Sequence, residues 1–254
     1  MGALRDDETV AAATADIGTE ALAEVGADAV AEAAPGSVSA VVDLRDVVAV
    51  LGSFPVLAGV DLRVESGEIV LLEGPNGAGK TSVLRLCAGL LPVVRGHAIV
   101  FGHDLAVDRA AVRPLVGLLG HRNGLYADLT VTENVRFWAD TVGATAEEVA
   151  AAMARTAVDG RLADVPVRKL SAGQKRRTAI ASLIARRARL WLLDEPHAGL
   201  DASGRDVLDE TLREAAAAGA TLLVASHELE RAGGLATRRV RIVAGRVDDG
   251  GASS

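Results

Sequence analysis

The length, composition and charge of the chain exclude several classes of protein. Half of its 254 residues are hydrophobic but only 2% are aromatic, so the core must be built from Ala, Val and Leu, as expected for helices packed on a parallel sheet. A single cysteine, Cys87, excludes an intramolecular disulfide and indicates a reducing compartment, and the lack of a long uncharged apolar run or a basic signal peptide predicts a cytoplasmic protein.

The net charge of −7 lies entirely in segment 1–37, where eight carboxylates stand against a single arginine, Arg5. The rest of the chain is therefore neutral, unlike a typical nucleic-acid binder, and we expect no nucleic-acid partner. Segment 1–37 has few large apolar groups and ends in Ala-Ala-Pro-Gly-Ser, which predicts an acidic, alanine-rich disordered tail. Such a tail is either a solvated extension without a dedicated role or an arm that binds a partner.

Short β-branched and leucine runs separated by Gly and Pro begin at residue 38 and predict alternating strands and helices. Strands are expected over 41–50, 60–64, 69–72, 98–101, 116–119, 190–193 and 221–225. Helices are expected over 81–91, 131–142, 145–158, 171–188 and 205–218. A hairpin over 240–247 is expected to turn at Gly245-Arg246. The alternation predicts an α/β fold with a parallel sheet, and the strand-free stretch of about 122–187 predicts a helical insertion.

A glycine-rich segment connects the strand 69–72 to the helix 81–91. Residues 74–81 are Gly74-Pro75-Asn76-Gly77-Ala78-Gly79-Lys80-Thr81 and match the pattern G-x-x-x-x-G-K-[ST]. Glycines allow backbone N–H groups to curl around a phosphate, and Lys80 supplies a positive charge to the β- and γ-phosphates. The segment, together with Ser82, is therefore predicted to bind a nucleotide, with Thr81 as a ligand of Mg²⁺.

An apolar strand over 190–193 ends in two carboxylates, Asp194 and Glu195. Because strands of open parallel sheets point their C-terminal ends at the ligand crevice, Asp194 is predicted to reach the Mg²⁺ shell. Glu195 is placed to accept a proton from an attacking water, or to orient it. The alternative is an acidic helix cap after a buried strand, and the glycine-rich segment favours the catalytic interpretation.

Residues 170–174, Leu-Ser-Ala-Gly-Gln, resemble the LSGGQ signature of ABC ATPases and stand about 20 residues before Asp194. Two further segments resemble motifs of the same family. Residues 194–201, which end at Asp201, resemble its D-loop, and Ser226-His227 resembles its switch histidine. The resemblance extends from about residue 41 to residue 246, with the motifs in the family's order.

Membership in the ABC ATPase family implies an ATP-binding domain over 38–250, followed by a C-terminal tail at 251–254. The implied fold is a P-loop NTPase with a RecA-like core, a mainly parallel sheet, an antiparallel β region and a helical subdomain at about 122–187. The family also implies ATP and Mg²⁺ as cofactors, a second ATP-binding subunit, most simply a homodimer, and an integral membrane permease. The protein would then lie on the inner face of the cell membrane as a peripheral, ATP-hydrolysing translocase subunit.

In such a dimer, ATP lies between the glycine-rich loop of one subunit and the signature of the other. Helix N-termini favour anions, so a helix that opens at Ser171 and Gly173 would meet the γ-phosphate only across an interface. The family pattern adds Gln174 and Asp201 to the nucleotide site. It makes Lys80, Glu195 and His227 catalytic, with the imidazole of His227 donating a hydrogen bond to the γ-phosphate.

Two departures from the family pattern concern nucleotide and partner binding. The aromatic residue that stacks on adenine would fall near Leu51, and the nearest aromatic is Phe54. The loop that offers a glutamine to Mg²⁺ and to the membrane partner is here 120–124, Gly-His-Arg-Asn-Gly, without a glutamine. His121, Arg122 or Asn123 would have to take that role.

A narrower resemblance, carried by loop 120–124, by Leu-Thr at 129–130, by Glu-Asn at 133–134 and by 170–177, is to the ATP-binding subunits of heme exporters in cytochrome c maturation. It implies heme export. The alternative is a soluble ABC ATPase that acts on ribosomes or DNA, but such proteins usually carry two cassettes or a long coiled-coil insertion. A P-loop kinase or GTPase is disfavoured, because neither Asn-Lys-x-Asp nor a sign of a substrate lid is present.

The composition of segment 1–37 leads to a first prediction. Deleting these residues should leave the ATPase rate and the melting temperature essentially unchanged, because the segment offers little apolar surface to bury. Thermal melting and a steady-state ATPase assay of the full and truncated chains test this. A melting temperature lowered by several degrees would show that the segment packs on the core.

Overall fold

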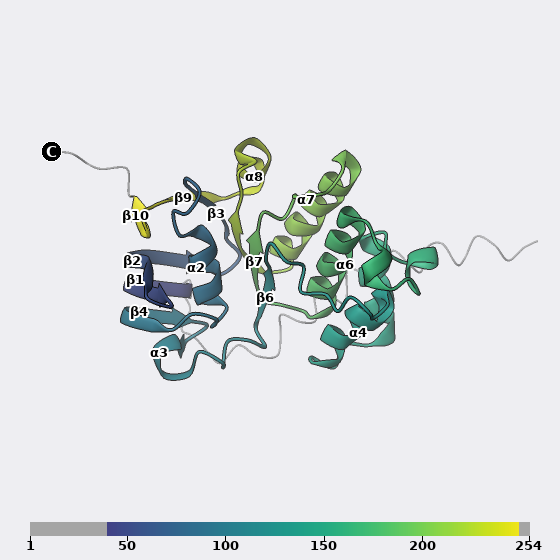
Figure 1. Cartoon of the computed structure of the whole chain (residues 1–254), viewed down its shortest axis with the longest axis horizontal. Helices are drawn as coiled ribbons and strands as arrows, with labels where there is room; N and C mark the ends of the chain where they lie inside the picture. Colours follow the sequence, from purple (N-terminus) through teal and green to yellow (C-terminus); the bar gives the residue numbers. More distant parts are fainter. Residues whose placement is uncertain (1–39, 249–254) are drawn as a thin grey trace, which may run out of the picture. The chain divides into compact units, whose positions relative to one another are not determined.

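The computed structural model of the chain describes residues 40–248, and residues 1–39 and 249–254 lie outside the description. The tails predicted at 1–37 and 251–254 are therefore not among the described residues. Within 40–248 the strands form one mainly parallel sheet and one antiparallel sheet, with helices packed on both faces of the parallel one (Figure 1). The predicted α/β fold class is confirmed.

The mainly parallel sheet has the strand order β10-β9-β3-β8-β7-β6. Its strands are β3 (Ile69–Glu73), β6 (Val116–Leu119), β7 (Leu190–Asp194), β8 (Thr221–Ala225), β9 (Arg238–Val243) and β10 (Arg246–Asp248). All neighbouring pairs from β9 to β6 are parallel, and β10 pairs antiparallel with β9. The C-terminal ends of β3, β7 and β8 therefore lie at one edge, where loops can form a ligand site.

The antiparallel sheet has the order β2-β1-β4-β5, formed by β1 (Ala40–Leu51), β2 (Phe54–Glu65), β4 (Val93–Val100) and β5 (His103–Asp104). The prediction of a strand at 60–64 was too short, because β2 pairs with β1 along its whole length back to Phe54. Pro55 and Gly59 interrupt the β-branched pattern of this strand and hid its first half. The strand predicted at 98–101 likewise begins earlier, at Val93, where it pairs with Ala49 of β1.

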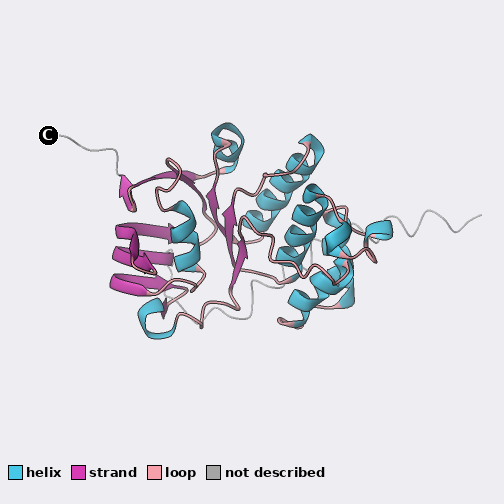
Figure 2. Ribbon diagram, in the orientation of Figure 1, coloured by secondary structure: helices cyan, strands magenta, loops and turns pink. Residues whose placement is uncertain are grey.

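The helices fall into two groups along the chain. The segment between β6 and β7 contains helices and, among the described residues, no strand (Figure 2). Its helices α4 (Val131–Asp140), α5 (Ala146–Arg155) and α6 (Ala172–Ala185) share a separate apolar core that includes Val135, Met153 and Ala181. The predicted helical insertion is therefore present as a packed unit.

The remaining helices are α2 (Lys80–Cys87), α3 (Leu105–Asp108), α7 (Ala202–Ala217) and α8 (Leu229–Leu235), besides short 3-10 turns at Gly160–Leu162 and Val167–Lys169. The sequence did not predict α3, α8 or β5, because each is too short to show a period. The helix predicted to reach residue 91 ends at Cys87. Gly89 has φ +66° and approaches the carbonyl of Arg109 so closely that only glycine fits, so the chain turns there.

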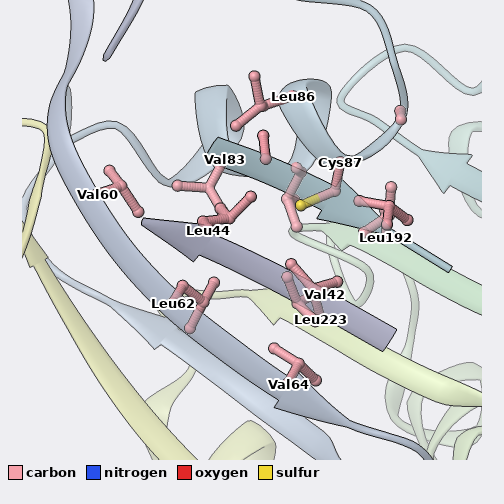
Figure 3. Packing of buried hydrophobic residues seen from close by; sticks show 14 of the residues in the cluster. Val42, Leu44, Val60, Leu62, Val64, Val83, Leu86, Cys87, Leu192 and Leu223 are labelled. Carbon is pink, nitrogen blue, oxygen red and sulfur yellow. The ribbon is translucent and has the colours of Figure 1, made fainter. Parts of the chain in front are cut away.

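Alternate residues of the central strands face two different layers, as the period of a strand requires. Leu192 of β7 and Leu223 of β8 pack with α2 and the antiparallel sheet; Figure 3 shows both in the cluster that contains Cys87 of α2 and Val42 of β1. Trp191 and Leu222 belong instead to the cluster that contains residues of α6 and α7. The two clusters fix α2 on one face of the sheet and α6 with α7 on the other.

The hairpin near the C-terminus is confirmed, but its predicted turn at Gly245-Arg246 was one residue too late. Ala244 and Gly245 form the two-residue turn, with φ values of 48° and 75°. Positive φ at both central positions is the geometry of a type I′ turn, which suits the twist of a hairpin. Within residues 40–248, no helix has the length and apolar character that crossing a membrane requires.

Candidate functional site

Loop 74–79 leaves the end of β3 and enters α2 in a tight curve. Gly74 has φ +142°, and a Cβ there would lie 2.1 Å from the carbonyl oxygen of Ile242 in β9. Gly79 is the left-handed N-cap of α2, with φ +112°, and a Cβ there would lie 3.1 Å from the carbonyl oxygen of Val56. Both positions therefore require glycine, and the curved backbone exposes N–H groups without side chains in the way.

The N-terminus of α2 differs from those of the longer helices. The N-cap side chains of α4, α5, α6 and α7 each accept a backbone N–H bond, whereas α2 has no side-chain cap. The first N–H groups of α2 are free to bind an anion. Lys80, only 8% exposed, directs its Nζ back to the carbonyl oxygens of Gly74 and Pro75, at 2.7 and 3.1 Å, so a cation lies against the loop.

Thr81 and Asp194 are in direct contact although 113 residues separate them. The hydroxyl of Thr81 donates a hydrogen bond of 2.9 Å to Oδ2 of Asp194 at the end of β7. A hydroxyl and a carboxylate oxygen are the hard donors that Mg²⁺ prefers. The donor set therefore fits the magnesium site that the sequence predicted, next to the helix N-terminus.

Glu195 lies one residue beyond Asp194 and faces the end of β8. Its Oε2 accepts hydrogen bonds from the backbone N–H of His227, at 3.2 Å, and from the Ser226 hydroxyl, at 3.4 Å. Its Oε1 lies 3.4 Å from Nε2 of His227. The structure thus brings together Glu195 and His227, two residues that the sequence predicted to be catalytic, and the side chain of His227 is 55% exposed and so accessible to a ligand.

The predicted signature residues lie at the N-terminus of α6. Ser171 and Gln174 form a capping box, in which each side chain binds the backbone N–H of the other residue, at 3.2 and 2.9 Å. Gly173 packs against the D-loop segment, where a Cβ would lie 3.0 Å from the carbonyl oxygen of Gly199. Asp201 accepts a bond of 2.8 Å from Gly204 and caps α7.

These signature residues are not brought to the glycine-rich loop. Among residues 40–248, no hydrogen bond or ion pair joins Ser171, Gly173 or Gln174 to loop 74–81, and Figure 1 draws α6 and α2 on opposite sides of the strands β6 and β7. Within the single chain, the glycine-rich loop and the predicted signature residues are therefore separate from each other.

Arg176 is the main structural feature of the site that the sequence did not single out. It is 3% exposed, and its guanidinium donates to the carbonyl oxygens of Asp194, Glu195 and Pro196 and to two acceptors in loop 120–124. Burial lowers the pKa of Arg176 to about 10, against the opposing effect of the Asp194 and Glu195 carboxylates, so the side chain is a cation at neutral pH. Its place in segment 170–177, two residues after the signature, was the signal that the sequence offered.

Ser226 is a second residue whose contribution the sequence did not predict, because it stood out only as the neighbour of His227. Its side chain is almost fully buried and lies between Glu195 and the backbone N–H of Glu228, from which it accepts a bond of 3.1 Å. It thereby connects the carboxylate of Glu195 to the start of α8. Only the pairing of β7 with β8 reveals this arrangement.

Phe54 is the aromatic side chain at the tip of the β1–β2 hairpin. It is 77% exposed and pairs with Leu51, which is 52% exposed. Val56, two residues further on, is the residue whose carbonyl approaches Gly79 at the start of α2. An accessible ring therefore lies on the same hairpin end that borders the glycine-rich loop.

A cavity of about 430 Å³ lies between β6, the segment after α2, and the helices α4 and α6. No residue of loop 74–81 lines it, whereas Asn123 and Gly124 of loop 120–124 do. Trp138 in its wall is covered by the guanidinium of Arg186, 4.8 Å from the ring centre, and contacts Phe137 edge to face. Phe137 in turn contacts Tyr126, so three of the six aromatic residues of the chain gather beside this cavity.

Comparison with known proteins agrees with this geometry. Residues 57–198 match the family described as ABC transporter. The chain is 40% identical over 193 residues to the cytochrome c biogenesis ATP-binding export protein CcmA of Nitrobacter winogradskyi, covering 76% of this chain and 93% of the relative. It is 41% identical over 187 residues to the CcmA protein of Paramagnetospirillum magneticum, covering 72% and 86%.

A solved structure described as the ATP-binding subunit of an ABC transporter superposes with a TM-score of 0.75. It is 27% identical and covers 82% of this chain and 88% of that one. The glycine-rich loop, the carboxylates at the end of β7 and the capped signature helix thus occur together in a fold of the expected type. The chain belongs to the ABC transporter family and is an ATP-binding, ATP-hydrolysing subunit of that family.

Proposed function

We propose that this chain powers export across the cell membrane in cytochrome c biogenesis, with heme as the cargo class, by binding and hydrolysing MgATP at loop 74–81. The main support for an ATPase site is the hydrogen bond between Thr81 and Asp194, which lies beside the uncapped N-terminus of α2. Identity of about 40% to the CcmA proteins supports the biological role. The name of those relatives, an ATP-binding export protein, favours transport over action on ribosomes or DNA.

Nucleotide binding follows from the residues around α2. The free N–H groups of the loop and of the first turn of α2 bind the phosphates, and Lys80 turns from the carbonyls of Gly74 and Pro75 to the β- and γ-phosphates. Thr81 and Asp194 would hold Mg²⁺, which would offset charge on the phosphate oxygens. Phe54 supplies a stacking surface for the base.

Hydrolysis requires a water molecule aligned with the bond between the β- and γ-phosphates. Glu195 accepts a proton from this water as the oxygen attacks the γ-phosphorus, and the bond to the ADP oxygen breaks. His227 contacts Oε1 of Glu195 and donates a hydrogen bond to the γ-phosphate. Phosphate and ADP are the products, and the proton held by Glu195 is released to solvent.

The second half of the site comes from another subunit. Ser171 is exposed and Gly173 partly exposed, and neither reaches the glycine-rich loop of its own chain. A second copy placed head to tail brings its Ser171 and Gly173 to the γ-phosphate, whose negative charge the N-terminus of α6 stabilises. Hydrolysis therefore needs Lys80, Thr81, Asp194, Glu195 and His227 of one copy, with the α6 N-terminus of the other.

The membrane permease docks, in this proposal, at the cavity beside loop 120–124. Aromatic side chains and arginines are enriched in protein interfaces, and both line or border this cavity. Docking there places the partner next to a loop that binds Arg176, and Arg176 in turn binds the carbonyl of Asp194 at the end of β7. The protein is thereby attached to the inner face of the membrane through its partner.

Replacing Trp138 with alanine should reduce co-purification with the permease by about 10-fold or more, because central aromatic anchors contribute about 2 kcal/mol or more to interfaces. The ATPase rate of the isolated subunit should stay unchanged. Val107→Ala is the control, since this exposed apolar residue of α3 does not line the cavity. Equal recovery of the permease with Trp138→Ala and with the parent chain would show that the permease does not dock at this cavity.

The export role is tested in a bacterium whose own CcmA gene is deleted. Expression of this chain with its membrane permease should restore heme-stained c-type cytochromes, and Glu195→Gln should not. The purified complex should also hydrolyse ATP faster when heme is added. An active ATPase that restores no cytochrome c would refute the export role and leave the ATPase assignment standing.

A further inference from the structure

Arg176 is a buried cation that no carboxylate neutralises by a hydrogen bond. A guanidinium has five N–H donors in a fixed planar fork, and all five are used. Each partner is a neutral oxygen of the protein. The acceptors and distances are Pro196 O at 3.0 Å, Gly120 O at 2.8 Å, Asn123 Oδ1 at 3.0 Å, Asp194 O at 2.9 Å and Glu195 O at 2.6 Å.

Three of these acceptors hold the backbone that carries Glu195. Glu195 has φ +48°, a left-handed conformation that is unfavourable for a residue with a Cβ. Arg176 binds the carbonyls on both sides of this position, and the backbone N–H of Glu195 donates to Ala225 of β8 at 2.8 Å. The peptide is thus fixed from two directions, which sets the direction of the carboxylate.

The other two acceptors belong to loop 120–124, the segment that lacks the glutamine expected from the family. His121 and Arg122 are exposed and Asn123 is partly buried. Asn123 directs its Oδ1 at Arg176. One side chain therefore joins three segments: the start of α6, the loop beside the cavity, and the residues around Glu195.

We propose that Arg176 is a positioning residue that holds Glu195 in the geometry for turnover and transmits the position of loop 120–124 to it. The proposal rests on the proposed role of Glu195. A lysine at this position would keep the charge, but its three donors radiate from one atom and cannot bind all three segments in the same plane. Displacement of loop 120–124, for example by a docked partner, would pull Arg176 and with it the carbonyls of Asp194 and Glu195.

The test compares Arg176→Gln and Arg176→Lys with the parent chain, using the full-length protein. Melting temperature, MgATP affinity by calorimetry, and kcat at saturating MgATP are measured. Arg176→Gln should lower kcat by about 10- to 100-fold, because a displacement near 1 Å costs about 100-fold, while the affinity for MgATP changes by less than about 3-fold since loop 74–81 is untouched. Arg176→Lys should restore part of kcat.

Lys175→Gln is the matched control, because it removes a neighbouring cation of α6 whose side chain makes no hydrogen bond or ion pair with the described residues. It should leave kcat unchanged. In a Glu195→Gln background, Arg176→Lys should alter the residual rate by less than about 2-fold, since a residue that acts through Glu195 has nothing further to position. Asn123→Ala should lower kcat in the same direction without loss of stability.

Two results would overturn the proposal. One is a folded Arg176→Gln or Arg176→Lys variant that hydrolyses ATP at the parental rate. The other is a fall of MgATP affinity, kcat and melting temperature together without rescue by lysine, which would make Arg176 only a structural link. If Arg176→Gln does not fold, the kcat values of Arg176→Lys and Asn123→Ala test the proposal without it. A parent chain without ATPase activity, or full activity of Glu195→Gln, would instead refute the proposed function.

Discussion

Lys80→Ala should weaken MgATP binding by about 1,000-fold, or ~4 kcal/mol, the expected loss of two charge-assisted hydrogen bonds. Lys80 is the cation held against the glycine-rich loop, with Nζ bound to the carbonyls of Gly74 and Pro75. Without it, the N–H groups of the loop and of α2 must balance the phosphate charge alone. ATPase activity should be lost together with binding.

Calorimetric titration with MgATP measures this loss directly. A second readout is the melting temperature. MgATP at a concentration that saturates the parent but lies well below the Kd of the variant should raise the melting temperature of the parent and leave that of the variant nearly unchanged, since only binding to the folded state stabilises it. Lys169→Ala is the control, because Lys169 is exposed and is one of only three lysines in the chain. Equal MgATP affinity of Lys80→Ala and the parent would refute the assignment of the loop.

Glu195→Gln should bind MgATP normally and lower turnover by about 1,000-fold, within the range attributed to general-base catalysis. The amide keeps the shape of the carboxylate and can still accept the bonds from His227 and Ser226 that hold Glu195 in place. It cannot take a proton from the attacking water. Asp194 and Thr81 remain in contact, so the metal site is unaffected.

The stalled variant should accumulate as a dimer with nucleotide between the subunits. Size-exclusion chromatography with light scattering, in ATP and Mg²⁺, measures this state. Glu210→Gln on α7 is the control, because its exposed carboxylate pairs only with Arg213 and lies outside the site. If Glu195→Gln hydrolyses ATP at the parental rate, Glu195 is not the general base of the reaction. An inactive variant that binds ATP and stays monomeric would instead show that closure requires the membrane partner.

In the proposed head-to-tail dimer, the glycine-rich loop of one copy and the α6 N-terminus of the other would both be needed for the reaction. Gly173 packs against Gly199 of the D-loop segment, and Asp201 caps the helix that follows. In the proposed dimer, a subunit that binds the α6 N-terminus of its partner would also lie beside the partner's segment 199–201. That segment leads back along the chain to Glu195, and Arg176 joins Glu195 to loop 120–124.

The sequence by itself determined the parts of the site that consist of contiguous residues. The glycines of 74–79 are required by positive φ and close backbone approach, so their spacing already identified the loop. The Ser171–Gln174 capping box and the carboxylates after the strand 190–193 were readable for the same reason, because a cap or a strand end depends on residues within a few positions of each other. The parallel sheet followed from the alternation of strands and helices.

Only the tertiary structure decided which distant residues meet. The Thr81–Asp194 contact follows from the parallel pairing of β3, β8 and β7, and the five bonds of Arg176 depend on how α6 packs against that sheet. The first half of β2 was hidden because its pairing with β1, rather than its own pattern, makes it a strand. A local pattern specifies backbone conformation through nearby sterics and hydrogen bonds, whereas the partners of a buried side chain depend on the packing of segments that are far apart in the chain.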